Sequence, residues 1–188
     1  MLFLSAIQKE IEESYGASTG LDVLDFVIPR TDFRPLGSLV VSQASADDLD
    51  IALVLDRDIF AAYAASEMRA VTVSIEEVSH FVYLSFNHAR GRNVTALEME
   101  IQSEVDRILL AYHGKLEIST DVQTRMLEEL YERSYPEARY EEARKAAARF
   151  VRSLSHGDPR AWTARERERL SQFFHSDLST KLLLADRK

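Results

Sequence analysis

Hydrophobic residues recur with two different periods along this chain, and the change between them predicts its architecture. Leu4, Ile7 and Ile11 recur at helical spacing before Gly16, which predicts a short amphipathic N-terminal helix. Three short runs rich in branched and aliphatic residues follow, separated by clusters of Pro, Gly, Ser and Asp. They predict strands at LDVLDFVI (21–28), GSLVVSQA (37–44) and LDIALVLD (49–56), the last two joined as a hairpin across SADD.

The period becomes helical in the second part of the chain. DIFAAYAASEM (58–68) has helical spacing, RAVTVS (69–74) is strand-like, and everything from Ser74 onward predicts helices. A hydroxyl residue followed three positions later by Glu marks a capping box, and this pattern occurs at Ser74–Glu77, Thr95–Glu98 and Thr163–Glu166. Helix ends are predicted at RGRN (90–93), at His113 with a left-handed Gly114, and at about residues 134, 154, 174 and 186.

These elements indicate an α+β protein. A small, mainly antiparallel sheet in the N-terminal third is followed by a helical C-terminal two-thirds. The chain has 188 residues and shows no internal repeat or linker, so we expect one domain over 1–188, with a helix and strands in 1–73 and helices in 74–188.

Composition narrows the classes of function. The 31 acidic and 23 basic residues give a net charge of −8, which argues against nucleic acid or an anionic membrane as a partner. Cysteine is absent, so any metal would bind carboxylates and imidazoles. The apolar N-terminus lacks a basic leader, and no apolar run approaches the ~20 residues of a spanning helix. A cytoplasmic location is therefore expected.

The stretch SIEEVSHFVYLSF (74–86) holds the strongest candidate for a chemical site. Glu77 has a structural explanation as the capping partner of Ser74. His80 lies in an almost wholly apolar helix, where a buried imidazole needs a polar partner. Glu76, four residues earlier, and Glu77, three earlier, can both reach it. His80 is then either a core histidine bonded to a carboxylate, a ligand of a divalent metal, or a proton-transfer group.

The next predicted helix, TALEMEIQSEVDRILLAYHG, offers further ligands. Its helical wheel places Glu104 at the edge of the buried stripe and Glu100 one turn behind, further toward solvent. If the two helices pack antiparallel, Glu104 is the acid best placed to approach His80. The predicted catalytic residues are Glu76, His80 and Glu104, and the predicted ligands of zinc, manganese or iron are these three with Glu100. The alternative for Glu104 is an ordinary ion pair with Arg107.

Two known metal motifs are partly matched. Glu77-x-x-His80 resembles one half of the ferritin-like di-iron motif, whose second Glu-x-x-His is missing from this sequence. The zincin pattern His-Glu-x-x-His would need a histidine where this chain has Glu76. Neither motif is complete.

EEVSHFVYL and ALEMEIQSEVDRILL also resemble a family of uncharacterised bacterial proteins that share a Val-Ser-His-Phe helix followed by a glutamate-rich one. The resemblance spans about residues 20 to 185 and implies a bacterial cytosolic origin, but transfers no activity. The residue expected at position 77 in that family is a glycine, so the resemblance favours Glu76 over Glu77 as the functional carboxylate.

Two functions remain open. The absence of a complete catalytic set, of a cofactor-binding loop and of a nucleic-acid-binding surface favours a non-enzymatic cytosolic protein without a cofactor. Such an accessory or regulatory protein would bind a protein partner or form a homo-oligomer. The alternative is a metal-dependent hydrolase-like protein in which Glu100 or Glu77 assists a bound water. The C-terminal segment carries a dense group of apolar residues that either docks onto the core or forms a partner surface. These residues are Phe173, Phe174, Leu178, Leu182, Leu183 and Leu184.

Overall fold

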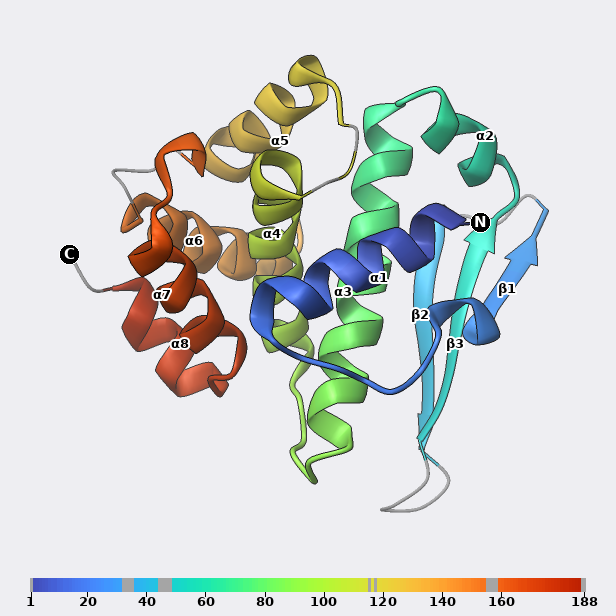
Figure 1. Ribbon diagram of the computed structural model, residues 1–188, viewed down its shortest axis with the longest axis horizontal. Coiled ribbons are helices and arrows are strands. Elements are labelled where there is room, and N and C mark those ends of the chain that lie inside the picture. The colour runs from blue at the N-terminus through green and yellow to red at the C-terminus, as the bar shows by residue number, and fades with distance from the viewer. Residues whose placement is uncertain are drawn as a thin grey trace.

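A small sheet lies on one side of the molecule, and the helices extend away from it (Figure 1). The computed structural model describes residues 2–31, 36–43, 49–114, 116, 118–154 and 159–186. The helices are α1 (Leu2–Tyr15), α2 (Asp58–Ala64), α3 (Met68–His88), α4 (Ala96–His113), α5 (Thr120–Glu132), α6 (Ala138–Arg152), α7 (Ala164–Phe174) and α8 (Leu178–Ala185), with 3₁₀ turns η1 (Val23–Phe26) and η3 (Pro159–Ala161). The α+β class is confirmed.

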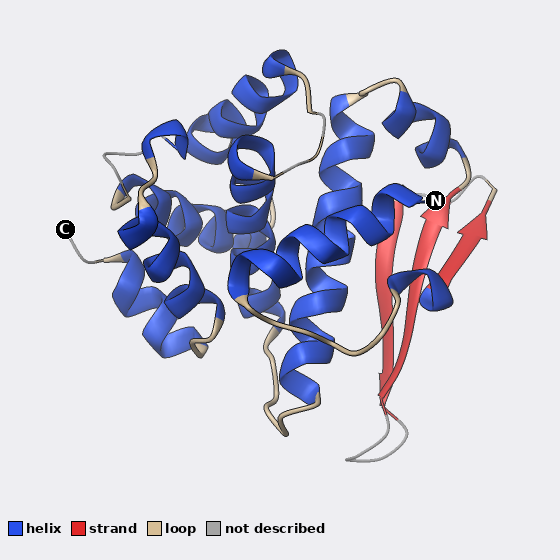
Figure 2. Cartoon of the chain, in the orientation of Figure 1, coloured by secondary structure: helices blue, strands red, loops and turns tan. Residues whose placement is uncertain are grey.

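The sheet has three strands, β1 (Val27–Arg30), β2 (Gly37–Gln43) and β3 (Leu49–Asp56), in the order β1-β3-β2. Figure 2 shows them grouped together at one side of the helices. β2 and β3 pair antiparallel, as the predicted hairpin requires, whereas β1 pairs parallel to β3. The connecting SADD lies outside the described residues. The strand predicted at 21–28 is mostly wrong, because Asp22 accepts the Leu24 N–H and starts the 3₁₀ turn η1.

The helix α3 begins at Met68, seven residues before Ile75, where its predicted N-cap, Ser74, would place its start. RAVTVS is therefore helical, and its prediction as a strand was wrong. Ser74 lies inside the helix, where its hydroxyl donates to the Ala70 carbonyl at 2.7 Å, so it does not cap and forms no capping box with Glu77. The β-branched residues alternate as in a strand, but Val71 and Ile75 are buried at helical spacing. Burial of that face outweighs the modest intrinsic preference of β-branched residues for strands.

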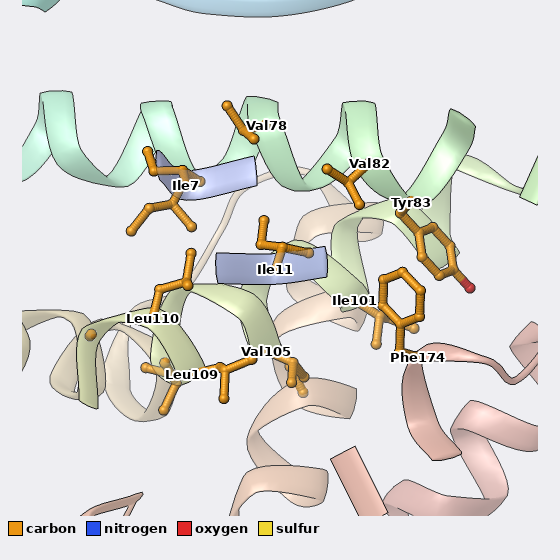
Figure 3. Packing of buried hydrophobic residues seen from close by; sticks show 14 of the residues in the cluster. Ile7, Ile11, Val78, Val82, Tyr83, Ile101, Val105, Leu109, Leu110 and Phe174 are labelled. Carbon is orange, nitrogen blue, oxygen red and sulfur yellow. The ribbon is translucent and has the colours of Figure 1, made fainter. Parts of the chain in front are cut away.

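The hydrophobic core lies where α1 crosses the α3–α4 pair. Figure 3 shows Ile7 and Ile11 of α1 between the side chains of the two longer helices. Both isoleucines are fully buried, and each such burial stabilises the fold by roughly 1.5–3 kcal/mol. The neighbours from α3 and α4 labelled there are Val78, Val82, Tyr83, Ile101, Val105, Leu109 and Leu110.

The helices α3 and α4 run antiparallel, which sets the register of the candidate site. Tyr83 contacts Glu98, and the earlier Ser79 contacts the later Asp106. Arg92, in the loop between the helices, donates to Glu98 Oε1 at 2.6 Å and to the Tyr83 hydroxyl at 2.7 Å. This loop therefore holds one end of the helix pair in place.

The predicted capping boxes at Thr95–Glu98 and Thr163–Glu166 are both present. The predicted end of α4 at His113 is also correct, but the left-handed cap is not, because Gly114 has φ −70°. A Cβ atom at this position would lie 2.7 Å from the Leu110 carbonyl oxygen. Gly114 is thus required by close packing on the helix end. No helix in the described part of the chain is long and apolar enough to cross a membrane.

A polar cluster is buried within the helical core. Asp106 accepts hydrogen bonds from Tyr15, Ser79 and Gln102 at 2.5–2.8 Å. Lys181 of α8 is fully buried and donates to Gln102 Oε1 at 2.6 Å. These five residues, which we call the Asp106 network, join α1, α3, α4 and α8.

Candidate metal centre

Three side chains from the two antiparallel helices converge on one point. Glu76 and His80 of α3 and Glu100 of α4 each offer one ligand atom, and these atoms lie within 4.8 Å of one another. No other group of three or more such residues occurs among the residues that the structure describes. The predicted Glu76–His80 pair is therefore brought together with a carboxylate from α4.

The α4 carboxylate at this point is Glu100, whereas the sequence favoured Glu104. Glu100 is only 8% exposed, because α6 covers it and brings Arg139 to 3.7 Å. Glu104 instead forms an ion pair with Arg107 at 3.1 Å, the alternative interpretation that its sequence spacing allowed. The helical wheel treated α4 as covered on one side, but it packs against both α3 and α6. Its buried surface therefore extends around to Glu100.

The imidazole of His80 lies between two carboxylates at distances too long for hydrogen bonds. Its Nε2 is 3.5 Å from Glu100 Oε2, and its Nδ1 is 3.8 Å from Glu77 Oε2. His80 Nε2 and Glu77 Oε2 are both buried, and neither has a hydrogen-bond partner in the described part of the chain. Such unsatisfied buried atoms are costly and call for an explanation.

The distance between His80 Nε2 of α3 and Glu100 Oε2 of α4 suits a bound cation. Two ligands at roughly 2.0–2.2 Å from one ion, at a tetrahedral angle, are about 3.4 Å apart. The His80–Glu100 separation of 3.5 Å matches this value. Rotation of the Glu76 side chain would then complete a set of three protein ligands. The remaining coordination position would be left for water or a substrate oxygen.

The electrostatics of the site favour bound positive charge. Burial lowers the pKa of His80, but the Glu100 and Glu77 carboxylates outweigh it and raise that pKa to about 10. Burial raises the pKa of Glu76 to about 7, with His80 opposing this and the Glu77 charge adding to it. Without a metal, the carboxylates therefore favour the protonated form of His80, and burial favours the protonated form of Glu76.

Glu77 has a different role from the predicted cap. It lies inside α3, 7% exposed, and faces the Nδ1 side of the His80 ring while Glu100 faces the Nε2 side. A carboxylate beside the second nitrogen of a metal-binding histidine orients the ring and raises its basicity. Glu77 is thus placed to orient the His80 ring from its Nδ1 side, opposite the nitrogen that would bind the metal.

Glu76 lines two neighbouring pockets. One, of about 300 Å³, is also lined by Glu100, Glu104 and Tyr135. The other, of about 430 Å³, is lined by Arg107 and Tyr135, among others. Neither Arg107 nor Tyr135 could be selected as a pocket residue from sequence, because each becomes a wall residue only through the packing of α5 and the following loop on α4. The three-residue cluster is therefore accessible from outside the core through its Glu76 side.

Comparison with known proteins found no matching family model, no similar curated protein and no similar solved structure. The resemblance to a bacterial family with a Val-Ser-His-Phe helix stays a prediction. The geometry of the site is therefore the basis for assigning its chemistry.

The raised pKa of His80 predicts how the stability of the metal-free protein depends on pH. Between the ordinary pKa of about 6.5 and the folded pKa of about 10, the folded state holds a proton that the unfolded state releases. The stabilisation from His80 is thus complete below about pH 6.5 and is lost as the pH rises toward 10, by at most about 1.4 kcal/mol per pH unit.

Urea unfolding between about pH 7 and 9 in the presence of EDTA measures this slope. We expect the free energy of unfolding of the His80→Gln variant to fall less steeply with pH than that of the wild type. Equal slopes for the two proteins would show that His80 is not held as a cation.

Proposed function

We propose that this protein binds a divalent metal ion through Glu76, His80 and Glu100 and acts as a metal-dependent hydrolase-like enzyme. The observation that carries the proposal is the convergence of three ligand atoms within 4.8 Å, one of them a buried imidazole nitrogen without a hydrogen bond. One imidazole and two carboxylates suit zinc, manganese or iron.

The site has the features that metal-assisted hydrolysis needs. A bound divalent ion would lower the pKa of a coordinated water. Glu76 belongs to the ligand cluster and also lines both pockets, so a substrate in either pocket would lie beside a residue that holds the ion. Glu104 and Tyr135, on the wall of the smaller pocket, are placed to hydrogen-bond to a substrate or a water there.

Metal binding competes with a proton at this site. Because the pKa of His80 is raised to about 10, its imidazole must lose a proton before it can bind an ion near neutral pH. Metal affinity should therefore increase with pH, and binding should release a proton to the buffer. Calorimetry in buffers of different ionisation enthalpy measures this release.

Titration of the metal-free protein with Zn²⁺ or Mn²⁺ tests the proposal directly. We expect one ion per chain, and a loss of affinity of more than about 100-fold in both His80→Gln and Glu100→Gln, since removal of a direct ligand costs more than loss of an outer-shell partner. Glu104→Gln should change the affinity much less, because Glu104 pairs with Arg107 outside the cluster.

His88→Gln is the matched control for nonspecific binding to histidine, since His88 lies on the same helix, outside the three-residue cluster. Circular dichroism verifies that each variant is folded. The proposal fails if no ion binds, or if Glu104→Gln weakens binding as much as Glu100→Gln does.

The expected role in binding a protein partner stays a prediction. Part of its basis was the apolar C-terminal segment, but Phe173, Phe174 and Leu184 are buried against the protein's own core. Exposed apolar side chains remain at Leu183 and at Val40 of the sheet. Sedimentation of the purified protein would show whether these residues contribute to self-association. Cytoplasmic location and bacterial origin likewise stay predictions.

A further inference from the structure

The larger pocket beside the metal site gathers several arginines in a protein of net negative charge. The chain carries a net charge of −8, yet three arginines, Arg69, Arg107 and Arg133, line this pocket together with two glutamates, Glu76 and Glu129. Glu129 is already bound by Arg107 at 2.9 Å and by Arg133 at 3.1 Å. Arg107 also pairs with Glu104, so Arg107 and Arg133 already have carboxylate partners and Arg69 is the arginine of this pocket in none of these ion pairs.

The arginines are held in different ways. Arg107 is 3% exposed and is fixed by Glu104 and Glu129 through its two terminal nitrogens. The guanidinium of Arg133 lies over the Tyr135 ring, 4.8 Å from the ring centroid. Arg69 is exposed and forms no ion pair with any residue of the described ranges. The pocket thus contains a guanidinium held by two carboxylates (Arg107), one stacked on an aromatic ring (Arg133) and one at the surface without an ion pair among the described residues (Arg69).

Two buried polar atoms in the lining have no hydrogen-bond partner in the part of the chain that the structure describes. They are Arg107 Nε and Thr72 Oγ1. Both are able to donate a hydrogen bond, and the residues that carry them line the same pocket. A buried donor without an acceptor is costly, so an acceptor that reached either atom from the pocket would stabilise this wall.

We infer that this pocket binds an oxyanion, the phosphate or carboxylate group of the substrate. Arg69 and Arg133 would supply charge-assisted hydrogen bonds from the open side, and Thr72 would donate from the first turns of α3. Guanidinium groups bind the planar or tetrahedral oxygens of these anions in a bidentate way. The start of α3 contributes the favourable end of its helix dipole, since Met68, Arg69 and Thr72 lie in its first turns.

The position of the pocket connects this anion site with the metal. Glu76 and Tyr135 line both pockets, so an anion held by Arg69 would place the adjoining part of the molecule beside the ligand cluster. The role of the anion site in a reaction rests on the proposed function, whereas binding of the anion itself does not. A metal ion that engages Glu76 would also remove a negative charge facing the anion. Metal and anion should therefore strengthen each other's binding by the same factor.

Titration of the full chain with inorganic phosphate and with acetate, in EDTA, tests the inference without a metal. We expect at least one of the two anions to bind, and Arg69→Gln to weaken that binding by about 10-fold or more, which corresponds to loss of one charge-assisted hydrogen bond. Thr72→Val should weaken it as well. The stronger of the two anions identifies the chemical group.

Arg125→Gln is the control, because Arg125 is an exposed arginine of α5 that pairs with Asp121 outside the pocket lining. Its affinity for the anion should equal that of the wild type. The His80→Gln variant should still bind the anion in EDTA, so anion binding without metal binding would support this inference while the proposed function fails. Absence of binding by both anions, or equal binding by Arg69→Gln and wild type, would overturn it.

Discussion

Replacement of Asp106 with leucine should lower the free energy of unfolding by about 3–5 kcal/mol. Asp106 is fully buried and accepts hydrogen bonds from Tyr15, Ser79 and Gln102. Leucine would leave these three donors without their acceptor, and each unsatisfied buried group costs about 1–3 kcal/mol. It would also remove a negative charge that favours the ammonium of Lys181. Urea unfolding monitored by circular dichroism measures the loss.

Lys181→Met is the informative comparison within the same network. Burial holds the pKa of Lys181 well below its ordinary value, so the buried ammonium is itself costly. Methionine keeps a similar shape and removes that cost, which offsets the loss of the donor to Gln102 Oε1 and to the Phe173 carbonyl. We expect a change of at most about 1.5 kcal/mol in either direction. A wild-type stability for Asp106→Leu, or an equally large loss for Lys181→Met, would contradict this account of the network.

Replacement of Phe174 with alanine should have an effect of similar size, about 3–5 kcal/mol. The Phe174 ring is fully buried and stacks on Tyr15 with 4.3 Å between centroids. It also meets the edges of Tyr83 and Phe86, at 5.3 and 5.4 Å. Alanine would leave a cavity where α1, α3 and α7 meet, and the helices could close it only in part. The midpoint of urea unfolding should move to a lower concentration.

Leu183→Ala separates this core contribution from a general effect of C-terminal apolar residues. Leu183 is 66% exposed, so its truncation should change the free energy of unfolding by less than about 0.5 kcal/mol. If both variants lost equal stability, the C-terminal segment would not be anchored mainly through Phe174.

Part of the candidate site could be predicted from sequence because it depends on local helical spacing. Glu76 and His80 are four residues apart on one helix, and that spacing alone makes them neighbours. The third ligand, a carboxylate of α4, could not be chosen from local spacing. Glu100 and Glu104 are one turn apart on α4, and only the cover provided by α6 makes Glu100 the buried one.

The proposed anion pocket could not be predicted from the sequence at all. Arg69 lies in α3, Arg107 in α4 and Arg133 directly after α5, and the three have no common pattern in the sequence. From the sequence, each of these arginines would be interpreted as an ordinary surface charge. These arginines come together only when α5 packs on α4 beside the start of α3.

The sequence by itself determined the α+β class, the β2–β3 hairpin, the capping boxes at Thr95 and Thr163, and the Glu76–His80 pair, because periodicity, turn residues and capping act over a few positions. The tertiary structure alone decided that RAVTVS is helical and that Glu77 faces His80 instead of capping a helix. It also selected Glu100 over Glu104. In each of these cases local sequence preferences are weak, and burial against a distant part of the chain determined the outcome.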